Sequence, residues 1–297
     1  MNLATAHVNS MNRASVNDSL RERLRGDGLD WIVPDWDAPS NVGAFMTTRN
    51  GDAAREGGFD VGGADMPIEQ ARVVAEHRRR IEAYLPAAPR WLTQIHGADV
   101  VEVDGDDPGY TSSADAAVTR RANVVLTVRV ADCMPVLFAT RDGGVVGIAH
   151  AGWRGLARGV LERTLQSMRC DPRDVRAWLG PAIGATAFEV GADVFDAFVA
   201  HDEDARGAFA PLRPGKWLAD LEAIARRRLA RAGVRAIAAS GLCTYQDPAR
   251  FFSYRRDGSR GRMAAFIWRT NDPPTLAPLA APRGGRSAAW GGPAPRE

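Results

Sequence analysis

The sequence predicts an α+β protein with mixed β-sheets flanked by helices in a single domain. Two observations support this class. Short apolar runs of strand length follow one another directly in places, as in hairpins, and segments of helical periodicity lie between them in no regular order. The chain has 297 residues, of which 45% are hydrophobic, so it can bury one large core.

Four segments are typical of buried strands. Residues 123–130 (NVVLTVRV) form a short run rich in β-branched side chains. Residues 135–140 and 145–150 predict a hairpin, because the turn sequence Arg-Asp-Gly-Gly joins them. Residues 263–268 predict the closing strand.

Two segments carry apolar residues at helical spacing. In residues 155–168 they are Leu156, Val160, Leu161, Leu165 and Met168. In residues 217–232 they are Leu218, Leu221, Ile224, Ala225 and Leu229. Gly233 follows the second segment, where a C-terminal cap is expected.

The two ends differ in composition from this patterned body. Residues 1–27 are rich in Asn, Ser and Arg and predict a disordered N-terminal arm. Residues 271–297 are dense in Pro, Gly and Ala and predict a disordered tail. Residues 28–270 are therefore the expected folded domain.

Charge and cysteine content limit the function classes. The formal net charge is +2, which gives no indication of a nucleic-acid or membrane partner. No apolar stretch approaches the ~20 residues of a membrane helix. The three cysteines, Cys133, Cys170 and Cys243, are too few and too scattered for a disulfide framework, so we expect a reducing compartment, the cytoplasm.

Five histidines are present, and their settings differ. His7 lies in the arm, His77 in a run of arginines and His201 in an acidic stretch, so we expect these three on the surface. His96 and His150 each follow an apolar, strand-like segment.

A possible site combines His96, Cys133 and His150. Each lies where a buried strand pattern breaks into a loop, and such breaks present catalytic groups. If the three side chains converge, two imidazoles and a thiolate suit zinc, with a fourth position left for water or substrate. Copper is also compatible with this set, and a metal-free cysteine–histidine dyad is the other interpretation.

Three arginines lie beside glycines in turn-like segments, namely Arg49, Arg154 and Arg255. Arginine binds phosphate through paired, charge-assisted hydrogen bonds, so these residues are candidates for a phosphate site. Neither a G-x-x-x-x-G-K-[ST] loop nor a dinucleotide-binding G-x-G-x-x-G pattern is present.

A series of motifs resembles the bacterial laccase-domain, or multicopper polyphenol oxidase-like, proteins, also described as purine nucleoside phosphorylases and as a peptidoglycan editing factor. The resemblance covers about residues 42–268. The matching segments are residues 47–51 (TTRNG), 93–97 (TQIHG), 114–116 (ADA), 130–135 (VADCMP), 149–155 (AHAGWRG), 179–183 (LGPAI), 243–245 (CTY), 251–258 (FFSYRRDG) and 261–264 (GRMA).

The resemblance implies that His96, Cys133 and His150 are zinc ligands. It also implies phosphorolysis of adenosine, inosine and methylthioadenosine, with adenosine deamination as a second activity. By motif position we assign Arg49, Arg154 and Arg255 to phosphate binding. We assign catalytic roles to Cys133, His150 and Asp132. Asp132 is expected to act as an acid or as a carboxylate that orients a ligand. Residues 51–62, in the loop expected on the substrate side, depart from the family pattern, so the resemblance does not specify the preferred nucleoside.

Three alternatives remain open at this stage. One is a copper-dependent polyphenol oxidase, which disagrees with the small number of well-placed histidines. Another is a metal-free hydrolase that edits peptidoglycan precursors, with Cys133 as nucleophile and His150 as base. The third is a noncatalytic binding module. The sequence leaves the oligomeric state open.

Overall fold

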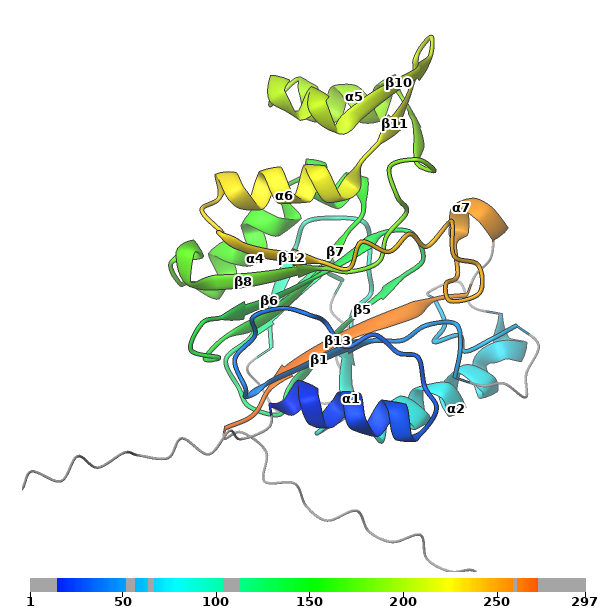
Figure 1. The fold of residues 1–297 in the computed structure, drawn as a ribbon, viewed down its shortest axis with the longest axis vertical. Helices are drawn as coiled ribbons and strands as arrows, with labels where there is room; N and C mark the ends of the chain where they lie inside the picture. Colours follow the sequence, from blue (N-terminus) through cyan, green and yellow to red (C-terminus); the bar gives the residue numbers. More distant parts are fainter. Residues whose placement is uncertain (1–14, 52–56, 64–66, 104–112, 259–260, 272–297) are drawn as a thin grey trace, which may run out of the picture.

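Two β-sheets lie face to face at the centre of the structure, and helices cover the outer face of each (Figure 1). The fold is that of a computed structural model, which describes residues 15–51, 57–63, 67–103, 113–258 and 261–271. Its layers run from helices through the two sheets to helices again.

Both large sheets mix parallel and antiparallel neighbours, as the predicted fold class requires. The four-stranded sheet has the order β1 (Val42–Met46), β13 (Met263–Arg269), β5 (Val125–Val130) and β2 (Pro89–Trp91), and its β2–β5 pair is parallel. In the six-stranded sheet the outer pairs are parallel and the inner pairs antiparallel. Its order is β12 (Ala236–Ala239), β8 (Val175–Leu179), β6 (Met134–Thr140), β7 (Val146–Ala151), β4 (Ala116–Thr119) and β3 (Val100–Glu102).

The central strands are buried on both faces, which explains their continuous apolar runs. In β1, Val42, Ala44 and Met46 pack between the two sheets, whereas Phe45 faces the outer helices. Strand β13 alternates in the same way, and all but its last residue are buried. Successive side chains of a strand point to opposite faces, so one short strand contributes to two cores.

The outer layers contain five of the helices. Helices α4 (Val160–Met168), α5 (Ala192–Val199) and α6 (Leu221–Arg231) belong to the core outside the six-stranded sheet. Helices α1 (Val16–Gly26) and α2 (Ala71–Glu82) belong to the core outside the four-stranded sheet. The smaller elements are β10 (Phe209–Arg213), β11 (Lys216–Ala219), β9 (Glu189–Gly191), α3 (Trp153–Ala157), α7 (Tyr254–Asp257), η1 (Ile68–Gln70), η2 (Pro172–Asp174) and η3 (Glu203–Ala208).

The predicted strands and hairpin are confirmed as β5, β6, β7 and β13, whereas both predicted helices are shorter than expected. The first is divided into α3 and α4 at Gly159, whose φ of +85° is incompatible with a continuous helix. The second begins at Leu221, because the preceding residues form β11 and Asp220 caps the helix by accepting from Ala223 N. Gly233, with φ of +100°, ends the helix as predicted.

The prediction of a disordered arm over residues 1–27 is wrong for its second half. Ser15 caps helix α1 in a capping box with Asp18, and Val16, Leu20 and Leu24 are buried. These side chains recur every four residues on an otherwise polar helix, a pattern too sparse to dominate the composition. Residues 1–14 and 272–297 lie outside the described residues, so the rest of the arm and nearly all of the tail stay predictions. Within the described segments, no helix is both long and apolar enough to cross a membrane.

Candidate functional site

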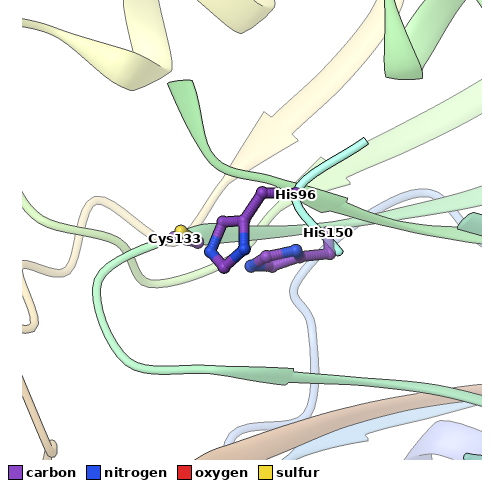
Figure 2. A group of neighbouring side chains, drawn as sticks. All are labelled: His96, Cys133 and His150. Carbon is purple, nitrogen blue, oxygen red and sulfur yellow. The ribbon is translucent and has the colours of Figure 1, made fainter. Parts of the chain in front are cut away.

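His96, Cys133 and His150 meet at one point of the structure (Figure 2). Their ligand atoms all lie within 4.8 Å of one another, and the two imidazole centroids are 4.9 Å apart. His96 lies in the loop after β2, Cys133 in the turn between β5 and β6, and His150 on β7. The predicted convergence of these three side chains therefore occurs.

The strand connections explain this convergence. Strand β5 belongs to the four-stranded sheet and β6 to the six-stranded sheet, so the turn carrying Cys133 passes from one sheet to the other. Strand β7 pairs antiparallel with β6, and the pairing places His150 opposite Pro135, two residues after the cysteine. A thiol and an imidazole distant in sequence thus become neighbours at a junction of two rigid sheets.

Two glycines of the 149–155 motif leave room for the cluster. A side chain at Gly152 would collide with the Cys133 sulfur. At Gly155 an added Cβ would lie 3.0 Å from the carbonyl oxygen of Gly97, in the loop that carries His96. The motif therefore supplies His150 together with the space that the Cys133 side chain and the His96 loop occupy.

Cys133 and His150 perturb each other's pKa. Burial would raise the pKa of the Cys133 thiol, but the facing His150 and His96 more than offset this and lower it to about 6. Burial would lower the pKa of His150, but the Cys133 thiolate and Asp115 raise it to about 9. A low thiol pKa favours the thiolate, the form that binds metals and acts as a nucleophile.

The Asp115 carboxylate is fully buried beside the cluster. It accepts hydrogen bonds from three backbone N–H groups of the His96 loop and lies 2.8 Å from Nδ1 of His150. Burial opposes its charge, but His150 and the loop N–H groups lower its pKa. No role for Asp115 was predicted from the sequence, although its place beside the apolar run Ala-Ala-Val was a visible indication.

Asp132 joins separate motifs rather than contacting His150. Its carboxylate accepts from the Thr244 hydroxyl at 2.6 Å and from the Arg255 backbone N–H at 2.7 Å. Its carbonyl accepts from Ile183 N, and its φ is +91°, a left-handed conformation that few non-glycine residues adopt. The carboxylate bonded to His150 is Asp115.

The cluster lines a cavity of about 450 Å³, a volume suited to a small organic ligand. Apolar lining residues from α3, α6, α7 and the segment before β9 include Trp153, Ile183, Phe188, Leu221 and Tyr254, and the end of β5 and the turn after it add Val130 and Ala131. Polar lining residues come mainly from the four-stranded sheet and its loops, and they include Gln94, Arg129 and Arg262. None of these three polar residues was predicted from the sequence as a site residue. Gln94 is joined to β5 by hydrogen bonds with the backbone N–H and carbonyl of Arg129.

The three arginines assigned to phosphate are not gathered together. Arg255 lines the cavity, where its guanidinium lies over the Phe188 ring and donates to Glu189 O. Arg49 is not among the described lining residues; it donates to Pro248 O and lies over Phe252. Arg154 is likewise absent from that described lining and lies over its neighbour Trp153.

The other histidines divide as follows. His201 is exposed, as predicted. The surface prediction for His77 is wrong, because its ring is buried against Phe59 and its Nδ1 lies 2.8 Å from Asp60 O. His7 lies outside the described residues.

The donor set fits a metal ion. Two imidazoles and one thiolate are borderline-to-soft ligands of the kind that zinc prefers, and copper also accepts them. Among the residues that the structure describes, this is the one His, Cys, Asp or Glu group with spacing suited to a metal. The cavity beside it leaves space for a further ligand.

Comparison with known proteins extends these observations. The sequence profile of the family described as multi-copper polyphenol oxidoreductase laccase matches residues 43–270. A Pseudomonas aeruginosa protein named purine nucleoside phosphorylase PA4543 is 46% identical over 240 residues, or 80% of this chain and 98% of that protein. The Escherichia coli purine nucleoside phosphorylase YfiH is 45% identical over 251 residues, or 80% and 98%. The crystal structure of Neisseria meningitidis NMB0706 matches with a TM-score of 0.75 at 43% identity, covering 81% of this chain and 99% of that one.

Proposed function

The chain belongs to the multi-copper polyphenol oxidoreductase laccase family, and from that premise we propose that it is a zinc-dependent purine nucleoside phosphorylase. Its substrates are adenosine, inosine and methylthioadenosine, and it also deaminates adenosine. The observation that carries the proposal is the His96–Cys133–His150 cluster at the wall of a cavity large enough for a nucleoside. Relatives named purine nucleoside phosphorylase support this reaction class.

His96, Cys133 and His150 are the proposed zinc ligands. When bound there, zinc would supply a Lewis acid that polarises a water or substrate oxygen. The chain's residues hold and orient the reactants around it. Asp132 fixes the backbone of Arg255 and leaves its guanidinium at the cavity. Both Asp132 oxygens already accept hydrogen bonds, which favours this positioning role over the donation of a proton.

The mixed lining suits the two halves of the reaction. The exposed ring of Tyr254 offers a stacking surface for a purine. Arg255 remains our proposed phosphate ligand, with Arg129 and Arg262 adding positive charge to the same cavity. Arg49 and Arg154 are less suited, because neither is among the described residues that line the cavity.

The two reactions differ in their nucleophile. In phosphorolysis, a phosphate oxygen bonds to the anomeric carbon, the glycosidic bond breaks and the purine leaves with its bonding electrons and takes up a proton. In deamination, water adds to C6 of adenine and ammonia departs, which gives inosine. Held phosphate is required for the first reaction, and activated water suffices for the second.

Product analysis tests the proposal. The purified protein is incubated with adenosine, with and without inorganic phosphate, and its zinc content is measured. Phosphate-dependent release of adenine together with about one zinc per chain supports the proposal. A zinc-loaded protein that releases neither adenine nor inosine from adenosine contradicts the proposal.

A second candidate is the metal-free hydrolase that edits peptidoglycan precursors. The proximity of the Cys133 sulfur to His150 favours it, because a thiol and an adjacent base form a nucleophilic pair. Hydrolysis of peptidoglycan precursors by a metal-free preparation supports this candidate, whereas oxidation of phenols that requires copper supports the oxidase.

We also propose that the protein is cytoplasmic. The free thiols of Cys133, Cys170 and Cys243 support this location, because disulfides are rare in the reducing cytoplasm.

A further inference from the structure

The Asp115 carboxylate is surrounded by four hydrogen-bond donors, three from the backbone of residues 95–97 and one from the ring of His150. Its Oδ1 accepts from His96 N at 3.0 Å and lies 2.8 Å from His150 Nδ1. Its Oδ2 accepts from Gly97 N at 2.6 Å and from Ile95 N at 3.2 Å. A carboxylate has about four lone-pair positions, so these four donors saturate it.

For His150 this contact selects one ring nitrogen. An ionised carboxylate accepts hydrogen bonds and cannot donate them, so the imidazole Nδ1 must carry the proton that lies between them. The lone pair for a metal is then on Nε2. The Asp115 carbonyl also accepts from the His150 backbone N–H at 2.7 Å, so the same residue holds both the backbone and the ring of this histidine.

For His96 the contact stabilises an unfavourable backbone. His96 has φ of +57°, a left-handed conformation that is uncommon for residues other than glycine. The N–H groups of Ile95, His96 and Gly97 converge on Asp115, and this convergence holds the loop in that conformation. The side chain of His96 is exposed, so little packing holds it from the outside.

We propose that Asp115 is the positioning residue of the metal centre, because one buried carboxylate sets the tautomer of His150 and the loop conformation of His96. The inference rests on the metal centre of the proposed function. It assigns to the Ala-Asp-Ala motif the role of preorganising both imidazole ligands, which lie on different elements. Carboxylates of this kind typically change metal affinity or activity 10–100-fold when they are replaced.

The test compares Asp115→Asn with Asp99→Asn in the full chain. Asparagine has nearly the same shape, but its NH₂ group cannot accept, so the donors on one side of the carboxylate lose their acceptor. Asp99 is a matched control, because its side chain is exposed and its contact with Asp115 runs through its own backbone carbonyl. Zinc affinity is measured by competition with a chromophoric chelator, and Co²⁺ is added to report ligand geometry through its visible and thiolate charge-transfer bands.

We expect Asp115→Asn to bind zinc about 10–100-fold more weakly and to change the Co²⁺ spectrum, while Asp99→Asn matches the wild type. A lower melting temperature of metal-free Asp115→Asn with unchanged zinc affinity and Co²⁺ spectrum overturns the inference and leaves the metal centre intact. A wild-type protein that binds no zinc overturns the metal centre of the proposed function itself.

A second measurement applies if Asp115→Asn does not fold. In the zinc-loaded wild-type protein with ¹⁵N-labelled histidine, long-range ¹⁵N–¹H correlation identifies the protonated nitrogen of each ring. His150→Gln assigns the signals by the loss of one set. A protonated Nδ1 with a metal-bound Nε2 for His150 supports the inference, and the opposite assignment overturns it.

Discussion

A Cβ atom on Gly152 would lie 2.6 Å from the sulfur of Cys133, closer than real Cβ contacts allow. The backbone of this glycine is an ordinary extended one, with φ of −72°, so the need for glycine here is one of space rather than of conformation. Its place in the chain, between His150 and the start of α3, means that a methyl group would push the thiolate away from the histidines.

We expect Gly152→Ala to lose bound metal and activity while the fold persists. Overpacking of this kind costs about 1–3 kcal/mol, which a domain of ordinary stability survives. Metal content and thermal melting of the purified variant provide the measurement. Gly207→Ala is the control, because nothing lies within 4 Å of a Cβ at Gly207. Normal metal content in Gly152→Ala would show that the turn can adjust.

The three cluster residues give the second prediction. His96→Ala, Cys133→Ala and His150→Ala should each fall well below the roughly one zinc per chain expected for the wild type and lose both activities. His201→Ala, which removes an exposed histidine, should keep its zinc and both activities. The zinc content of each folded variant is measured by elemental analysis. Full zinc retention in all three variants contradicts the ligand assignment.

The third prediction concerns pH. Because the pKa of Cys133 is lowered to about 6, its thiolate fraction in the metal-free protein rises as pH increases through about 6 and falls as pH decreases below it. Burial raises the pKa of Cys170 instead, so that residue is the internal control. Alkylation by iodoacetamide, followed by peptide mapping across pH 5–9, should show Cys133 reacting at neutral pH well before Cys170. Equal pH profiles for the two thiols would contradict the prediction.

The fourth prediction separates the two reactions. Arg255→Ala should slow phosphorolysis by about thirty- to a thousand-fold, or roughly 2–4 kcal/mol, and leave deamination much less affected. Arg49→Ala and Arg154→Ala are the comparison variants, and we expect a smaller, unselective effect from them because neither residue is among the described lining of the cavity. Adenine and inosine release are measured side by side at varied phosphate concentration. If Arg255→Ala slows both reactions equally, the residue is no phosphate ligand.

The fifth prediction concerns helix α1. Leu24 is nearly fully buried, so Leu24→Ala should lower the free energy of unfolding by about 2–5 kcal/mol. Glu22→Ala, on the exposed face of the same helix, should change it by less than about 0.5 kcal/mol. Urea denaturation of the two variants provides the comparison. Equal stabilities would mean that α1 contributes little to the core.

Much of the fold and the cluster could be predicted from local sequence. The segments that became β5, β6, β7 and β13 are apolar because both of their faces are buried, and that burial is visible as a continuous run. His96, Cys133 and His150 were identifiable because each reactive side chain ends such a run, and the order of the motifs identified the family.

The sequence alone was therefore sufficient for the fold class, for the type of β5, β6, β7 and β13, and for the three residues that form the cluster. Tertiary structure decided which polar residues act together. The burial of α1 depends on contacts with strands far along the chain, and the bonds of Asp132 and Asp115 join residues 123 and 35 positions apart. Periodicity reports burial on one element, whereas a hydrogen bond between elements depends on how the sheets meet. For that reason the carboxylate beside His150 proved to be Asp115 rather than Asp132.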